Sequence, residues 1–123
     1  MANDRVFIEE CTETLSVLGP VTAKRMFGGD GFFLEGMMFA LAVDNLLYLK
    51  ADDLNRPLFE ERDLPPFTYQ RGDRSASLSY HRVPEEALNH VPAMKPWAQS
   101  AWDAARRAAA KKQKKKKRAG RRK

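Results

Sequence analysis

The sequence has one cysteine, two histidines and no long apolar run in its 123 residues. The single thiol, Cys11, excludes an intrachain disulfide and a cysteine-built zinc site, and it fits a reducing compartment. The longest apolar run, Met37 to Val43, is much shorter than the roughly 20 residues that a membrane-spanning helix needs. The first residues show no basic region followed by an apolar one, so we expect no secretory signal. These absences predict a cytoplasmic protein without a metal, a cofactor or a membrane span.

Acidic residues are missing from one end of the chain. The formal net charge is +6, from 22 Lys and Arg against 16 Asp and Glu. Residues 106–123 hold twelve of these basic residues and no acidic one. Residues 1–105 therefore keep ten basic residues against all 16 acidic ones, a net charge of −6. Such an asymmetry between the body and the end of a chain is typical of an interaction tail.

The first fifty residues predict a helix followed by strands. Apolar residues recur at helical spacing near the start, where Asn3 or Asp4 can cap the helix, and Gly19-Pro20 ends it. Turn residues then separate extended apolar segments, which indicates an antiparallel meander. The predicted elements are a helix over about 4–18 and a three-stranded meander. Its first part is extended over 21–27 and 32–34 and is interrupted by Gly28-Gly29-Asp30-Gly31, and its other strands cover 37–43 and 46–50.

The second half predicts a short helix, a hairpin and a final helix. These elements cover about 52–60, then 67–70 and 75–82 around the turn Arg71-Gly72-Asp73-Arg74, and a helix from Pro92 or Lys95 onward. Strands that come in runs indicate an antiparallel sheet. We therefore predict a two-layer α+β fold in the order α-β-β-β-α-β-β-α. Residues 1–105 form the domain, and residues 106–123 form a basic tail that extends the last helix.

No group of side chains has the spacing of a catalytic or metal site. His81 and His90 have no second metal ligand or nucleophile nearby in the sequence, so we interpret both as surface histidines. Cys11 lies on the apolar face of the first helix, where a thiol is buried and inert. Trp97 and Trp102 follow the apolar stripe of the last helix, which favours a place in the core over stacking on bases. We predict no catalytic residue.

The cluster Gly28-Gly29-Asp30-Gly31 is the one candidate for a phosphate cradle. Phosphate loops require a Lys-Ser/Thr pair or a further glycine that opens a helix, whereas a strand follows here. Asp30 would also repel an anion. We interpret the cluster as a bulge or sharp bend that allows a close approach of the backbone.

The tail has a composition that cannot pack into a core. Its like charges repel one another, so we expect it to be disordered or a fraying extension of the helix when free. It offers no apolar face and no lipidation site, which favours nucleic acid over an anionic membrane as its partner. The alternative is a solvated tail that aids solubility only. The predicted nucleic-acid-binding residues are Lys111, Lys112, Lys114, Lys115, Lys116, Lys117, Arg118, Arg121, Arg122 and Lys123.

Several segments carry a likeness to a known family. They are Arg25-Met26-Phe27-Gly28-Gly29-Asp30-Gly31-Phe32-Phe33-Leu34, Met38-Phe39-Ala40-Leu41, Leu47-Tyr48-Leu49-Lys50, Phe67-Thr68-Tyr69 and Tyr80-x-x-Val83-Pro84-Glu85-Glu86. In this order they resemble the N-terminal domain of the TfoX/Sxy family of bacterial competence regulators, from about residue 5 to residue 106. The resemblance implies helices packed on an antiparallel sheet. It also singles out Arg25, Met26, Phe27, Gly28, Gly29 and Gly31 as a family motif with an interaction or structural role.

The resemblance implies a role in transcriptional regulation, beside a cyclic-AMP receptor-type activator. We expect a non-catalytic regulatory or adaptor domain that binds a protein of the transcription machinery, while its tail binds nucleic acid in the bacterial cytoplasm or nucleoid. Two alternatives remain open. One is a small enzyme or ligand-binding domain with a pocket near Arg25, Gly28, Gly29 and Tyr80. The other is a chaperone-like homodimer that binds partners through an exposed sheet face or edge.

Overall fold

The first helix begins and ends where the sequence predicts. In the computed structural model, which describes residues 3–26 and 28–121, α1 covers Arg5–Leu15 and a short 3-10 helix, η1, covers Ser16–Leu18. The Asp4 side chain accepts a hydrogen bond from the Val6 amide, which satisfies a free donor of the first turn. Gly19 then adopts a φ of 148°, a conformation that suits glycine, and the helical segment stops.

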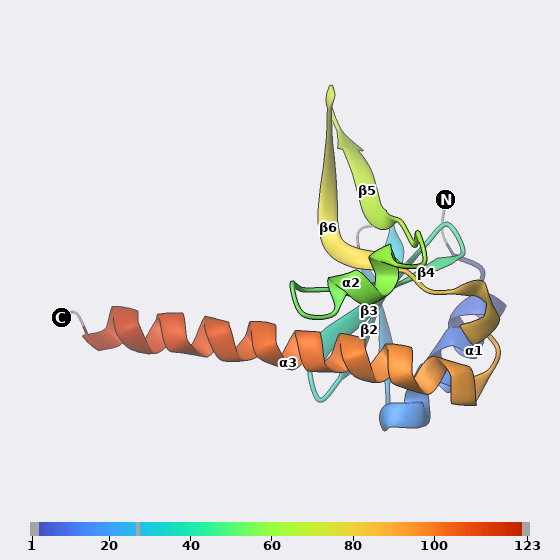
Figure 1. Ribbon diagram of the computed structural model, residues 1–123, viewed down its shortest axis with the longest axis horizontal. Coiled ribbons are helices and arrows are strands. Elements are labelled where there is room, and N and C mark those ends of the chain that lie inside the picture. The colour runs from blue at the N-terminus through green and yellow to red at the C-terminus, as the bar shows by residue number, and fades with distance from the viewer. Residues whose placement is uncertain (1–2, 27, 122–123) are drawn as a thin grey trace.

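Within the described part of the chain, six strands form a single antiparallel sheet in the order β1-β2-β3-β4-β6-β5. The strands β2 to β4 are joined by tight turns at Glu35-Gly36 and Asp44-Asn45, whose positive φ angles are those of hairpin turns. The hairpin of β5 and β6 stands clear of the rest of the molecule (Figure 1). The strands are β1 Thr22–Met26, β2 Gly29–Leu34, β3 Met37–Val43, β4 Leu46–Lys50, β5 Pro66–Arg71 and β6 Arg74–Arg82.

The α+β class and the antiparallel sheet are confirmed, but four strands precede α2 (Arg56–Glu60) where the sequence predicted three. The glycine cluster is the cause of the difference. Gly28 has a φ of 74° and makes the turn, whereas Gly29, Asp30 and Gly31 lie within β2 and pair with β1 and β3. The cluster therefore forms a turn and the first residues of a strand, and the register of β2 against β3 shifts only later, between Phe32 and Phe33.

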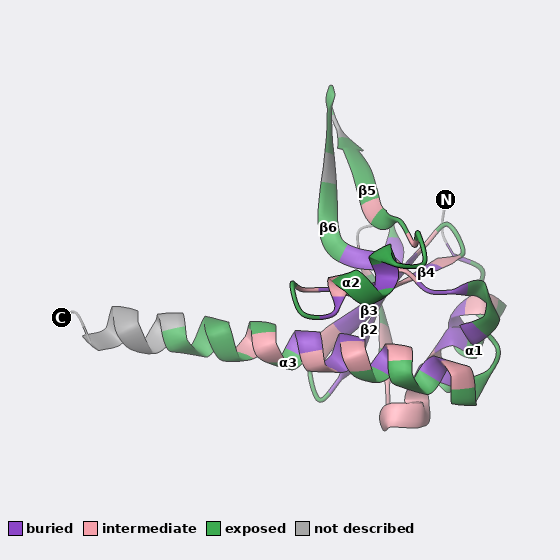
Figure 2. Ribbon diagram, in the orientation of Figure 1, coloured by how far each residue is buried: buried purple, intermediate pink, exposed green. Residues whose placement is uncertain are grey.

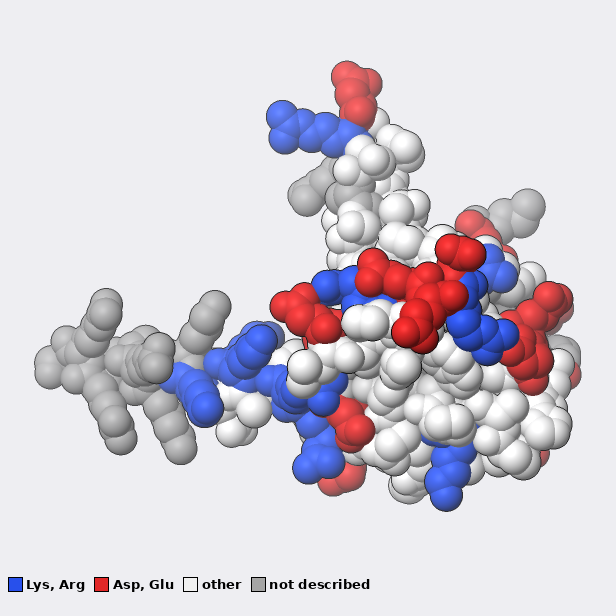
Figure 3. Space-filling view, in the orientation of Figure 1, with Lys and Arg blue, Asp and Glu red and all other residues white. Residues whose placement is uncertain are grey.

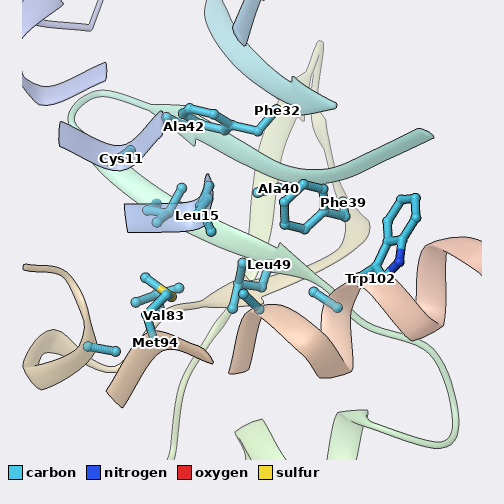
Figure 4. Close-up of a cluster of buried hydrophobic side chains, with 14 of the residues drawn as sticks. Cys11, Leu15, Phe32, Phe39, Ala40, Ala42, Leu49, Val83, Met94 and Trp102 are labelled. Carbon is cyan, nitrogen blue, oxygen red and sulfur yellow. The ribbon is translucent and has the colours of Figure 1, made fainter. Parts of the chain in front are cut away.

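The hydrophobic core lies between the helices and one face of the sheet. The final helix, α3 (Val91–Arg121), follows a 3-10 turn, η2 (Glu85–Ala87), and packs against β3 and β4. Alanines at 98, 101 and 105 let this helix approach the sheet closely, and the Trp102 ring meets the Phe39 ring edge to face at 6.0 Å. Figure 4 shows these rings with Leu15 of α1 and Leu49 of β4 in the same cluster. Phe59 of α2 completes it.

The helix α3 continues far beyond the sheet. In its first part, buried and half-buried residues alternate with exposed ones along the helix, whereas all the described side chains from Ala110 onward are exposed (Figure 2). The backbone is helical to Arg121, so α3 runs through most of the basic segment. The division into a domain over 1–105 and a tail over 106–123 stays a prediction. No helix among residues 3–26 and 28–121 is both long and apolar enough to cross a bilayer.

An ion pair holds α3 where it leaves the body. Arg107 donates from Nε to Asp52 Oδ2 at 2.6 Å and from Nη2 to Asp52 Oδ1 at 2.9 Å. The Asp52 carboxylate also accepts from the amides of Leu54 and Asn55 before α2. The hydrogen bond from Arg107 lowers the pKa of Asp52 from 3.8 to about 2. This two-pronged contact fixes the direction in which the basic end of α3 points.

We predict that Arg107→Gln lowers the free energy of unfolding by about 1 kcal/mol at neutral pH, because the pair is partly exposed to water. The pKa of Asp52 is lower in the folded state, so its stabilisation is complete above its unfolded value near 3.8 and is lost as the pH falls toward 2. Urea titrations between pH 7 and pH 2 should therefore show the difference between wild type and variant shrinking with acid. A difference in unfolding free energy between wild type and variant that stayed constant over this pH range would contradict the stabilising role of the pair between Arg107 and Asp52.

Candidate functional site

The family motif lies on the hairpin of β1 and β2. Arg25 and Met26 end β1, Gly28 makes the turn, and Gly29 and Gly31 lie in β2, while Phe27 falls outside the described residues. A Cβ atom at Gly29 would collide with the Ala42 carbonyl oxygen, and one at Gly31 would lie 2.6 Å from the Met26 sulfur. The need for glycine at both positions therefore follows from close packing in the sheet.

Asp30, in the middle of this motif, is a buried carboxylate with internal partners. It is 2% exposed, and Arg5 of α1 clasps it with Nη2 at 2.8 Å from Oδ1 and Nη1 at 3.1 Å from Oδ2. Asn3 Nδ2 donates a third hydrogen bond at 3.0 Å. The hydrogen bonds from Arg5 hold the pKa of Asp30 below its usual value. The predicted bulge or bend did not anticipate this role: the carboxylate lies within β2 and joins this strand to α1.

The same network reaches the turn between β3 and β4. Asn3 Nδ2 also donates to the Ala42 carbonyl at 2.7 Å, and Asn3 Oδ1 accepts from the Asn45 amide at 2.8 Å. The Asn45 side chain in turn accepts from the Asp4 amide at 2.8 Å. The start of α1 is thus fastened to two neighbouring segments of the sheet by Asn3, Arg5, Asp30 and Asn45. Sequence reasoning missed this network, although an Asp inside an apolar strand is itself a signal that a basic partner must exist.

The pocket expected near Arg25, Gly28, Gly29 and Tyr80 is not formed. Tyr80 lies on β6, and the strands β3 and β4 separate β6 from β2. An open depression of about 600 Å³ lies elsewhere, between α2 and the β5–β6 hairpin. Its lining includes Arg56, Glu60, Ser79 and His81. The sequence could not place Tyr80, because strand order is set by long-range pairing.

The two histidines have different surroundings. His81 is buried, although we expected a surface residue: it pairs with Leu49 across the strands, its ring stacks on Phe59 at 5.3 Å, and Nδ1 lies 2.8 Å from the Leu64 carbonyl oxygen. His90 is exposed, and its Nδ1 accepts from the Ala93 amide at the start of α3. The expected burial of Cys11 is confirmed, and burial raises the pKa of its thiol to about 12. Among the described residues, no cluster of His, Cys, Asp or Glu could hold a metal ion.

The predicted nucleic-acid-binding residues lie on the part of α3 that projects from the body. Lys111, Lys112 and Lys114 are exposed there. Figure 3 shows blue side chains along this projecting helix and red ones gathered over the body. Five further predicted residues lie on the helical backbone with side chains outside the described part, and two lie beyond the described residues altogether. They are Lys115, Lys116, Lys117, Arg118 and Arg121, and then Arg122 and Lys123.

We predict that Arg5→Gln destabilises the protein more than Asp30→Asn does. Removing Arg5 leaves a charged carboxylate in a buried site, whereas removing the charge of Asp30 leaves a half-exposed guanidinium that water can solvate. Urea denaturation at pH 7 should show the lowest midpoint for Arg5→Gln. Arg62→Gln, which breaks an exposed pair with Glu86, is the control and should hardly change the midpoint. Equal midpoints for Arg5→Gln and wild type would contradict the role of the buried pair.

Comparison with known proteins agrees with this fold. The sequence profile described as the TfoX N-terminal domain matches residues 13–105, which include the whole sheet and the packed part of α3. Protein Sxy of Escherichia coli (strain K12) is 26% identical over 98 residues, which cover 80% of this chain and 47% of Sxy. The chain therefore spans about half the length of that relative. Because the profile covers most of the chain, the protein belongs to the TfoX N-terminal domain family.

Proposed function

We propose that the protein is a non-catalytic regulatory or adaptor domain whose basic α3 extension binds nucleic acid without sequence preference. The observation that carries the proposal is the separation of charge: the body has a net charge of −6, and residues 106–123 hold twelve basic residues and no acidic one. Neutralising phosphates with Lys and Arg releases counterions, which favours binding at any sequence. Membership of the TfoX family supports the regulatory part of the proposal.

The structure makes the extension a suitable anchor. The pair between Arg107 and Asp52 holds α3 at the edge of the body, and the exposed side chains of Lys111, Lys112 and Lys114 lie on the helix beyond it. At about 1.5 Å per residue, the helix from Arg107 to Arg121 reaches about 20 Å, which is enough to follow a phosphate backbone over several nucleotides.

The nucleic-acid test uses the full chain and a neutral-tail variant. This variant replaces the ten predicted nucleic-acid-binding residues of the extension by Gln, which keeps the helix propensity nearly unchanged. The substitutions are Lys111→Gln, Lys112→Gln, Lys114→Gln, Lys115→Gln, Lys116→Gln, Lys117→Gln, Arg118→Gln, Arg121→Gln, Arg122→Gln and Lys123→Gln. Fluorescence polarisation on duplex DNA should show wild-type affinity falling about 10³–10⁵-fold between about 50 and 200 mM salt if about 6–10 phosphates are contacted. The neutral-tail variant should bind weakly and show a much shallower dependence on salt.

The matched control for this test carries Arg25→Gln and Lys95→Gln, two exposed basic residues on the body. It should bind duplex DNA with nearly wild-type affinity, because these residues lie outside the extension. Equal affinities of wild type and the neutral-tail variant for duplex DNA would refute the role of the extension.

The family resemblance also supports a protein partner in transcription, and with it a bacterial cytoplasmic or nucleoid location. We expect immobilised full-length protein to retain purified RNA polymerase or a cyclic-AMP receptor-type activator after nuclease treatment, since a nucleic-acid bridge is then removed. Failure to retain either one would refute the adaptor role and leave the nucleic-acid role standing. The homodimer considered from the sequence stays a prediction.

A further inference from the structure

The strands of the sheet carry a charge opposite to that of the body. They contain six basic residues and a single acidic one, Asp30. Asp30 is already paired with Arg5, so the sheet has an excess of positive charge inside a body with a net charge of −6. The remaining acidic residues of the body therefore lie on helices, turns and loops. The sheet is therefore positively charged, whereas the rest of the body is negatively charged.

The strand pairing assigns these residues to two faces. One row of paired residues faces the helices and belongs to the core: Ala23, Phe32, Ala40, Leu49 and His81. The next row points to the opposite side: Lys24, Gly31, Leu41, Tyr48 and Arg82. Helices α1, α2 and α3 all contribute side chains to the core on the first side. We call the second side the open face. Its centre is covered by its own side chains, since Leu41 and Tyr80 are buried there and the Met26 and Met38 sulfur atoms lie close to Gly31.

Aromatic rings gather on the open face near β4, β5 and β6. The Tyr48 and Phe67 rings meet edge to face with centroids 5.1 Å apart, and Phe67 and Tyr69 are nearly parallel at 6.1 Å. Tyr48 and Phe67 are half-buried, while Tyr69 is 37% exposed. Leu78 of β6, also on this hairpin, is 40% exposed. Exposed ring faces beside each other on a sheet are surfaces on which nucleic-acid bases stack.

Basic residues are interleaved with these rings. Lys50 Nζ lies 5.1 Å from the centroid of the Tyr80 ring, and Lys24 Nζ lies 5.2 Å from that of Phe33. The ion pairs between described residues use Arg5, Arg56, Arg62 and Arg107, so the open-face residues Lys24, Lys50 and Arg82 are not engaged in any of them. Burial lowers the pKa of Lys50, which shows that its ammonium is partly desolvated. A desolvated cation gains more from contact with an anion than one in free water.

We propose that the open face binds single-stranded nucleic acid, with bases stacked on Tyr69 and Phe67 and phosphates held by Lys50, Arg82 and Lys24. A polyanion fits this face, because these cations have no acidic neighbours on their strands. Asp52, which follows β4 and acts electrostatically on Lys50, is bound by Arg107. The ligand must also have bases whose ring faces are accessible, whereas in a duplex the bases are stacked on one another. Six strands about 4.8 Å apart span about 24 Å, so several nucleotides fit across the sheet. This inference does not depend on the basic extension of α3, which would bind duplex and single strand alike.

The test uses the full chain in the neutral-tail background, so that the extension contributes little. Fluorescence polarisation with single-stranded DNA and RNA of about 12 nucleotides should show binding that the matching duplex does not show. Tyr69→Ala should lower the single-strand affinity about 5- to 100-fold, which is the range for one lost base stack, while Tyr69→Phe should keep it. Leu54→Ala, which removes an exposed apolar side chain before α2, is the control and should have no effect.

A second measurement locates the contact without any mutation on the sheet. Single-stranded DNA that contains 5-iodouracil should crosslink under ultraviolet light to peptides of β4, β5 or β6, as identified by mass spectrometry. Crosslinks confined to residues 106–123 would overturn the proposal. The proposal would also be overturned if Tyr69→Ala in the neutral-tail background bound single strands with the same affinity as the neutral-tail variant alone. In that case a protein would be the better candidate for a partner of the open face. If the open face bound no single strands but the wild-type protein still bound duplex DNA, the proposed function of the extension would be unaffected.

Discussion

The packing of α3 is the constraint on which the rest of the structure depends. The first part of this helix buries Met94, Ala98, Ala101 and Trp102 against β3 and β4, and all three α-helices share that side of the sheet. Its later part carries the basic residues out of the body, past the pair between Arg107 and Asp52. One helix therefore closes the core, leaves the other face of the sheet open and presents a positively charged arm (Figure 1).

Local sequence patterns predicted most of the elements. The helical repeat and the cap at Asp4 gave α1, and the turn around Gly72 gave the β5–β6 hairpin. The number of strands was predicted wrongly, because three glycines in four residues are typical of a bend. Only the approach of the Ala42 carbonyl explains why Gly29 belongs inside a strand. This approach depends on β3 pairing with β2, which is not visible in the local sequence.

The features of the site that escaped prediction all depend on contacts between distant residues. Asp30 is buried because Arg5 and Asn3, far away in the sequence, reach it from the start of α1. His81 is buried because Phe59 of α2 covers it. In contrast, the positive charge of the extension can be counted directly from the sequence, since charge adds up along the chain and does not depend on contacts between distant residues. The open face became recognisable only when the strand order placed β4 beside β6.

The central claim is that nucleic acid meets this domain on its positively charged surfaces, the extension of α3 and the open face. The most direct measurement is a titration of the isotope-labelled full chain with duplex and single-stranded DNA, followed by backbone amide NMR. We predict that duplex shifts the signals of residues after Arg107 only, and that single strands also shift those of β4, β5 and β6. Shifts centred on α1 and α2, or no shift with either ligand, would contradict the account.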